Sequence, residues 1–272
     1  MRRRLLVAGL RRGGIELRQT VTNAADIIGY LFPVAILIVV LWLIGDAEVP
    51  GSSTSLSSYS LVSSMAMLLV IGGVASTAQY LTMDREDGTL LRAKATPNGM
   101  AGYLIGKVVL VSGVMVISCL AALIPGALLV EGLRFDGGTI LILLWLVPLA
   151  LLALLPVGAV LGALFETIRG AAMLMLPVTA LTGVSGIFYP LSVLPGWVQG
   201  VAQVFPMYWL GLGLRSAFLP GEPGRPWQTA GVLAAWAVVG LVLAPGILRR
   251  MARRESGSLV AARRERALTR TM

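Results

Sequence analysis

Residues 139–165 read TILILLWLVPLALLALLPVGAVLGALF, a run of 27 residues without a charged side chain. A helix needs about 20 predominantly apolar residues to cross the hydrocarbon core of a bilayer, because the core is about 30 Å thick and each residue adds about 1.5 Å. This run is therefore long enough to cross a membrane as one helix, and the rest of the chain can be searched for partners of the same kind.

The composition of the whole chain agrees with that stretch. Of its 272 residues, 57% are hydrophobic and 13% are charged, against roughly 45–50% apolar and about 25% charged residues in ordinary soluble domains. This composition excludes a typical water-soluble globule. The expected fold class is an all-α integral membrane protein.

Five further stretches qualify as membrane spans, which gives six in total. The predicted spans are about 27–44, 59–81, 103–130, 139–165, 170–190 and 227–248. Together they define a transmembrane domain over residues 27–248, preceded by an N-terminal segment, 1–26, and followed by a basic tail, 249–272.

The fifth stretch is unusual because no residue from Gly170 to Leu214 is charged. Two full spans there would make seven crossings and place the two termini on opposite sides of the membrane. Prolines, which break or bend helices, interrupt the stretch at positions 177, 190, 195 and 206. We therefore expect Pro190 to Pro226 to dip into the membrane from the outer side and return.

The distribution of basic residues supports six spans. With six crossings, 19 of the 22 Lys and Arg residues lie on the side of the two termini, and only Arg134, Arg215 and Arg225 lie on the other. Cytoplasmic segments carry such an excess of positive charge. We expect a multi-pass membrane protein with both termini in the cytoplasm.

The segment from residue 2 to residue 22 has the pattern of a helix that lies on a membrane surface. Its apolar side chains share one face: Leu6, Leu10, Leu17 and Val21. Three arginines spaced by seven form a separate stripe that would anchor the helix to anionic lipids of the inner leaflet: Arg4, Arg11 and Arg18. The alternative is a basic tail that only fixes the topology.

The connection after the second span, residues 82–102, is longer than two adjacent spans require. It mixes acidic and basic residues around Gly88 and ends at Thr96 and Pro97. It is either a solvated loop or a docking element for a cytoplasmic partner.

Several kinds of site are disfavoured by the residues that the chain lacks. There is no His and only one Cys, so His-based catalysis and thiolate metal sites are excluded, and we expect no metal site. No phosphate-binding loop of the Walker A type occurs, and no ionisable residue falls at a predicted bilayer midplane. The basic residues lie at chain ends and in loops, which indicates lipid headgroups rather than nucleic acid as partners. Any work must be supplied by another protein.

Two stretches resemble those of the ATP-binding-cassette type-2 exporter permeases, and among these the daunorubicin-resistance and nodulation-type permeases. Residues 84–97, DREDGTLLRAKATP, are similar to the signature after the second span of that family, except that Leu91 and Ala93 stand where the family often has Glu and Leu. Residues 186–219 are similar to the segment between spans five and six.

The resemblance implies two functional segments. The first is a cytoplasmic coupling helix between spans two and three that contacts an ATPase through Arg85, Glu86, Asp87, Gly88, Thr89, Leu90, Arg92, Thr96 and Pro97. The second is a re-entrant hairpin that gates the outer side, with Phe188, Tyr189, Pro190, Pro195, Trp197, Phe205, Pro206 and Arg215.

The resemblance also implies partners and a function. Two ATPase subunits would bind ATP and Mg²⁺, while this chain holds no cofactor and pairs with a second permease protomer, either identical or different. The cargo would be an apolar or amphipathic compound, such as a drug, a lipid or a glycolipid, moved out of the cell. Three other readings stay open: a scaffold that recruits an ATPase, an energy-independent channel, and, with the least support, an intramembrane hydrolase.

Overall fold

The computed structural model describes residues 2–45, 47, 54–96, 99–165, 167, 170, 172–173, 175–187 and 194–254. Within these ranges the regular elements are all helices. The expected all-α fold is confirmed.

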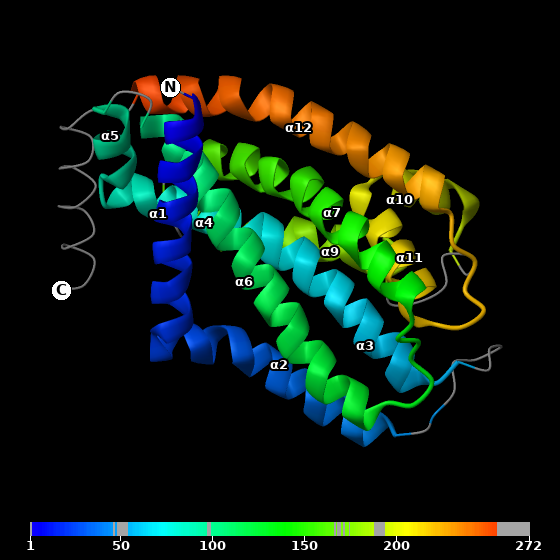
Figure 1. Cartoon of the computed structure of the whole chain (residues 1–272). Coiled ribbons are helices and arrows are strands. Elements are labelled where there is room, and N and C mark those ends of the chain that lie inside the picture. Colours follow the sequence, from blue (N-terminus) through cyan, green and yellow to red (C-terminus); the bar gives the residue numbers. More distant parts are fainter. Residues whose placement is uncertain are drawn as a thin grey trace.

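Five long apolar helices can each cross a membrane, and Figure 1 shows them side by side. Four of them are single α-helices: α2 (Ala24–Ile44), α6 (Gly99–Leu129), α7 (Gly137–Leu164) and α12 (Pro226–Arg254). The fifth runs without a break through α3 (Leu56–Met67), a π-helical turn η1 (Leu68–Gly72) and α4 (Gly73–Glu86). These helices coincide with the predicted spans at 27–44, 59–81, 103–130, 139–165 and 227–248, and each is long and apolar enough to cross a membrane.

The predicted span at 170–190 is not confirmed. Its described part contains helix α9 (Met175–Gly183), whose nine residues rise only about 14 Å. Residues 166, 168–169, 171, 174 and 188–193 lie outside the described ranges. The described residues thus provide five candidate spans, where the sequence predicted six.

Local sequence sets the helix ends. Asp136 caps α7, because its side chain accepts a hydrogen bond from the backbone N–H of Thr139 at 2.8 Å. Asn23 separates α1 (Arg2–Thr22) from α2 and accepts from the N–H of Ala25 at 3.1 Å. Gly88 ends α4 with a φ of 78°, a conformation that favours glycine.

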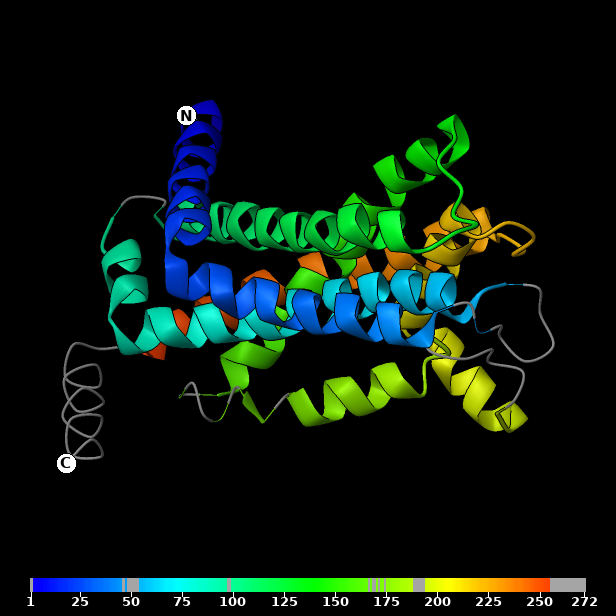
Figure 2. The ribbon, with the colours of Figure 1, turned by 90° about the horizontal axis from the view of Figure 1, so that it is seen from below.

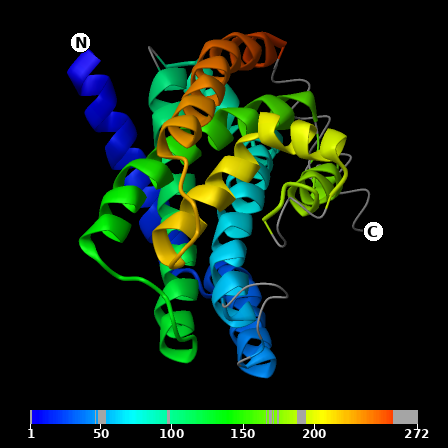
Figure 3. The same ribbon diagram turned by 90° about the vertical axis from the view of Figure 1, so that its right-hand side faces the viewer.

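Different helices lie at the two ends of the molecule. Helix α1 runs across the bundle at the end where α5 (Thr89–Lys94) and the last turns of α12 lie (Figures 1 and 2). Helices α10 (Gly196–Val204) and α11 (Pro206–Phe218) lie at the opposite end, which faces the viewer in Figure 3. The elements expected on the two sides of the membrane are therefore far apart.

Helix α7 lies at the centre of the packing, against α4, α11 and α12. Its side chains Leu146 and Leu154 join Leu210 and Phe218 of α11 in the main hydrophobic core. Large apolar side chains also point outward from the bundle, such as Trp42. An apolar surface of this extent matches contact with lipid.

Candidate functional site

The connection after the second span, for which the resemblance implies a coupling helix, is mostly helical. Helix α4 continues to Glu86, the chain turns at Asp87 and Gly88, and the six-residue helix α5 follows. The side chain of Asp87 accepts a hydrogen bond from the N–H of Thr89 at 2.8 Å. Arg92 Nη2 donates to Thr89 Oγ1 at 2.9 Å. These local bonds fix the turn and the first residues of α5.

Helix α5 rests on two membrane spans. Its apolar side chains Leu90 and Ala93 are buried in a cluster with Tyr103 of α6 and with Leu248 and Met251 of α12. The opposite face of α5 exposes Arg92 and Lys94. The helix therefore presents a basic face to the surroundings while its other face holds α6 and α12 together.

Arg85 lies at the base of this turn and is buried, with 5% of its surface exposed. Its Nη1 donates to the carbonyl oxygen of Phe165, the residue after α7, at 2.6 Å. Arg85 thus ties the end of α4 to the end of α7, and its side chain is not on the exposed face of α5.

The other predicted coupling residues divide by exposure. Arg92 and Thr96 are exposed, Glu86, Asp87 and Thr89 are partly exposed, and Gly88 and Leu90 are buried. Pro97 lies outside the described residues.

Five charged or polar side chains from three helices meet behind α5. Lys107 Nζ of α6 lies 2.9 Å from Glu16 Oε2 of α1 and 2.9 Å from Asp84 Oδ2 of α4. Tyr103 Oη donates to the same Asp84 oxygen at 2.7 Å, and Arg12 Nε donates to Glu16 Oε1 at 2.8 Å. We call Arg12, Glu16, Asp84, Tyr103 and Lys107 the ion-pair network.

The network stabilises the charged form of Glu16. Burial alone disfavours that charge, but hydrogen bonds from Arg12 and Lys107 outweigh burial and hold the pKa of Glu16 below its ordinary value. The guanidinium of Arg12 also lies 5.3 Å from the centre of the Tyr103 ring. The network thus links α1 to two membrane-spanning helices.

Sequence reasoning did not find this network. It placed Lys107 near the start of a span, where a long side chain can reach the headgroups. The one available signal is the pair of glycines at 102 and 106, because small residues let helices approach closely. Of the two, Gly106 faces α1: a Cβ added to Gly13 would lie 2.6 Å from its carbonyl oxygen, whereas a Cβ added to Gly102 would meet no atom within 4 Å.

The predicted outer hairpin is a pair of helices joined at Phe205. Pro195 precedes α10, and Pro206 is the first residue of α11, a position that suits proline because its missing N–H would have no helical partner. The ring of Phe205 stacks on that of Trp236 with centroids 6.0 Å apart, and Trp236 Nε1 donates to the carbonyl of Val204 at 2.8 Å. These contacts fasten the hairpin to α12.

Arg215 is the buried charge of this hairpin. Its Nη1 donates to the carbonyl oxygens of Gly186 and Ile187 at 3.1 and 3.4 Å, and its guanidinium lies 5.5 Å from the centre of the Tyr59 ring. Trp197 of α10, in contrast, is exposed. Arg215 thus joins α11 to the segment after α9. Phe188, Tyr189 and Pro190 lie outside the described residues.

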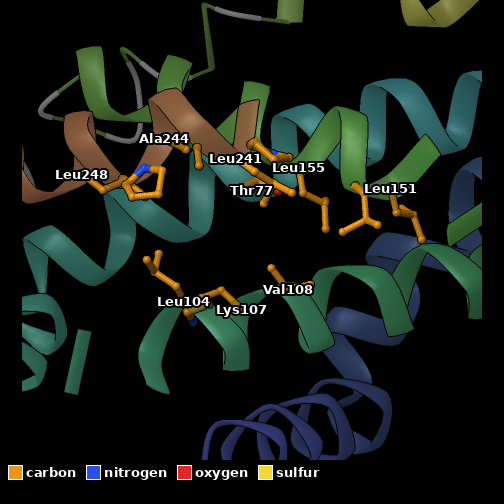
Figure 4. Close-up of a pocket in the computed structure, with 13 residues that line it drawn as sticks. Thr77, Leu104, Lys107, Val108, Leu151, Leu155, Leu241, Ala244 and Leu248 are labelled. Atoms are coloured by element: carbon orange, nitrogen blue, oxygen red, sulfur yellow. The ribbon is translucent and has the colours of Figure 1, made fainter. Parts of the chain in front are cut away.

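Two apolar cavities lie between α6 and α7. The inner cavity, of about 140 Å³, is shown in Figure 4 and is also bounded by α4 and α12. Its lining consists of Thr77, Leu104, Lys107, Val108, Leu151, Leu152, Leu155, Pro156, Ala159, Leu241, Ala244, Pro245 and Leu248. The outer cavity, of about 330 Å³, lies farther along the same two helices, next to α3, η1 and α11. Both offer binding space for aliphatic groups.

Residues 44–244, more than half of the chain, match the family model described as ABC-2 family transporter protein. The chain belongs to this family. No curated protein matches the chain.

The ABC-2 match extends over most of the helices and cavities described above. It covers α5, the inner and outer cavities up to Ala244, and the hairpin of α10 and α11, while α1 precedes it. ABC-2 chains are membrane transport subunits and normally have no catalytic site of their own. Among the described residues, no group of His, Cys, Asp and Glu could hold a metal ion.

Helix α1 of this ABC-2 protein has an exposed side with the predicted arginines. Arg11 and Arg18 are exposed, and so are Leu6 and Leu10. Leu17, in contrast, packs next to Gly113 of α6. The side chain of Arg4 lies outside the described residues. Lipid anchoring through Arg4, Arg11 and Arg18 stays a prediction.

Proposed function

We propose that this chain is the permease subunit of an ABC exporter, which moves an apolar or amphipathic compound out of the cell and is powered by a separate ATPase subunit. The observation that carries the proposal is helix α5 in an ABC-2 transporter protein. Its exposed face is basic, whereas its buried face rests on α6 and α12. Such a helix can receive a push from a partner and pass it to the spans.

The contacts around α5 suggest how the push is transmitted. Leu90 and Ala93 bear on Tyr103 and Leu248, so a displaced α5 moves α6 and α12 with it. Arg85 holds α4 to the end of α7 at the same time. Closure of two ATPase subunits on ATP and Mg²⁺ would then rock the spans between inward-open and outward-open packings.

The assembly in this proposal has two permease protomers and two ATPase subunits in the bacterial inner membrane, with both termini in the cytoplasm. The hairpin of α10 and α11 would close the outer end of the pathway. The contacts of Arg215 and Phe205 support this role, because they fix the hairpin to α3 and α12 and let it move together with them. The apolar cavities favour drug-like, lipid or glycolipid cargo.

The first experiment is affinity purification of the full chain in mild detergent, followed by ATPase assays on the proteins that accompany it. A cassette ATPase should co-purify with the wild-type chain. Arg92→Glu reverses the charge on the exposed face of α5 and should lower the amount of bound ATPase strongly. Arg225→Glu changes an exposed arginine at the other end of the molecule and serves as the matched control.

Two results would replace the proposal. Recruitment of an ATPase whose activity never responds to candidate cargo in reconstituted vesicles would favour the scaffold reading. Flux through vesicles that contain this chain alone, without nucleotide, would favour the channel reading.

A further inference from the structure

The inner cavity exists because α6 and α7 pack on different neighbours. Helix α6 packs mainly on α1 and α2, whereas α7 packs mainly on α12, α4 and α11. Helix α4 contacts both of them and closes the space at the back. A cleft therefore separates α6 from the pair formed by α7 and α12, as the gap between the labelled side chains in Figure 4 shows.

The lining of the inner cavity offers almost only carbon to a ligand. Its two polar side chains already have partners: Thr77 Oγ1 donates to the carbonyl of Gly73 at 2.7 Å, and the ammonium of Lys107 contacts Glu16 and Asp84. The remaining side chains are aliphatic. A cavity of this character holds an apolar group rather than water.

The mouth of the cavity opens within the membrane. Three lining residues at the mouth are 43%, 42% and 53% exposed: Val108 of α6, Leu152 of α7 and Leu241 of α12. All three belong to candidate membrane spans. A chain from a neighbouring lipid can thus enter sideways without passing through water.

The charge at one end of the cavity indicates which lipid fits. Helix α12 lines the cavity as far as Leu248 and continues directly with Arg249 and Arg250, which are both exposed. Guanidinium groups bind phosphate through charge-assisted hydrogen bonds. The lining residues of α12 share one helix face, which Arg249 flanks, whereas Arg250 lies on the opposite face. A lipid whose chain lies along the lining face would place its phosphate beside Arg249, where a net negative headgroup is favoured over a neutral one.

We propose that the inner cavity binds one acyl chain of an anionic phospholipid from the leaflet next to α5, with the lipid phosphate at Arg249. Ala244 and Leu248 line this cavity and also belong to the cluster that holds α5. The bound chain therefore supports the packing of α12 beneath α5. This inference concerns the permease alone and does not depend on an ATPase partner.

The test uses the full chain in lipid nanodiscs and a phospholipid with a photoreactive diazirine in its acyl chain. Irradiation, digestion and mass spectrometry locate the adducts. A phosphatidylglycerol probe should place its adducts mainly at the lining residues in 104–108, 151–159 and 241–248. A phosphatidylcholine probe with the same chain should label these positions less.

Variants separate a specific site from general lipid contact. Val108→Phe fills the mouth of the cavity and should lower labelling of the lining about tenfold, since excluding about two methylene groups of the chain removes that much affinity. Leu152→Phe fills the mouth from α7 and should act alike, should the first variant misfold. Val239→Phe, on the half-exposed lipid side of α12, should leave labelling unchanged.

The headgroup is tested by Arg249→Gln, which should remove the preference for phosphatidylglycerol, whereas Arg250→Gln on the opposite face of α12 is the matched control and should keep it. The proposal is overturned by adducts spread evenly over all outward-facing positions, by labelling that the two Phe variants do not reduce, or by equal labelling from both probes. It is also overturned when the lining is unlabelled because a second copy of the chain covers the cleft. None of these results touches the proposed function.

Discussion

At the scale of single residues, the charged side chains near α5 make contacts that their positions in the sequence do not indicate. Lys107 neutralises two carboxylates on other helices, and Arg85 binds a backbone carbonyl on α7. A charged residue near the end of a predicted span is expected to be solvated, because the sequence does not show whether other helices bury it. Its burial depends on helices that are distant along the chain, here α1 and α7.

Lys107→Met should destabilise the protein by about 3 kcal/mol, because it leaves the buried carboxylate of Asp84 and the partly buried carboxylate of Glu16 without their shared cation. The thermal midpoint in detergent measures the loss. Combining Lys107→Met with Asp84→Asn should restore part of the stability, since one unpaired charge is then absent. A midpoint equal to that of the wild type for the single variant would contradict this role for Lys107.

The lowered pKa of Glu16 predicts how acid affects the docking of α1. The carboxylate is stabilised in the folded state, so its contribution is complete above the ordinary pKa of Glu, about 4.3. It is lost as the pH falls through the lower pKa of the folded state. The difference in thermal midpoint between the wild type and Glu16→Gln should be constant above that pH and shrink below it. A difference that grows in acid would show the opposite sign of the shift.

At the scale of elements, α1 is held to α6 by small residues. Gly9 and Gly13 lie against Gly106 and its neighbours, and the ion-pair network lies beside this contact. The sequence pattern predicted an apolar face formed mainly by leucines, because hydrophobic periodicity is recognised from large apolar side chains. A contact formed by glycines leaves no such signal. The helix itself was predictable, but its packing face was not.

Gly13→Leu should release α1 from α6, because even a Cβ at this position would lie 2.6 Å from the carbonyl oxygen of Gly106. The measurement is disulfide formation between Leu17→Cys and Gly113→Cys in a Cys119→Ser background, since Leu17 packs beside Gly113. Cross-linking should fall several-fold. Gly14→Leu is the matched control, because a Cβ there meets no other atom within 4 Å. Equal cross-linking in both variants would refute the close contact.

The turn around Gly88 shows a second limit of sequence reasoning at this scale. A helix of six residues is too short to show a period, so the residues alone left a solvated loop or a docking element open, and only the resemblance implied a helix there. What orders them is burial of Leu90 against α6 and α12. That burial depends on a helix more than 130 residues away along the chain.

At the scale of the whole molecule, the long apolar runs were sufficient to predict five spans. Their lengths match the thickness of a bilayer, and charged connections separate them. The run from Gly170 to Leu214 contains no charge to mark its divisions. Its described helices, α9, α10 and α11, are all too short to cross a membrane alone.

The two ends of the bundle should face opposite sides of the membrane. In a Cys119→Ser background, Lys94→Cys on α5 and Arg225→Cys beyond α11 place single thiols at exposed positions of the two ends. A membrane-impermeant maleimide added to intact cells should label only the thiol at position 225. Labelling at position 94 instead would invert the topology.

The π-helical turn η1 in the second span has a consequence for how its two halves are oriented. A π-turn accommodates one residue more than a regular helical turn, and one residue corresponds to a rotation of about 100° around the helix axis. Before it, Ser63 faces the chain near Ile187; after it, Asp84 faces Lys107. Deletion of a single residue within η1 could restore a regular helix, yet it would turn Asp84 away from its partner. The extra residue thus sets the rotational phase between α3 and α4.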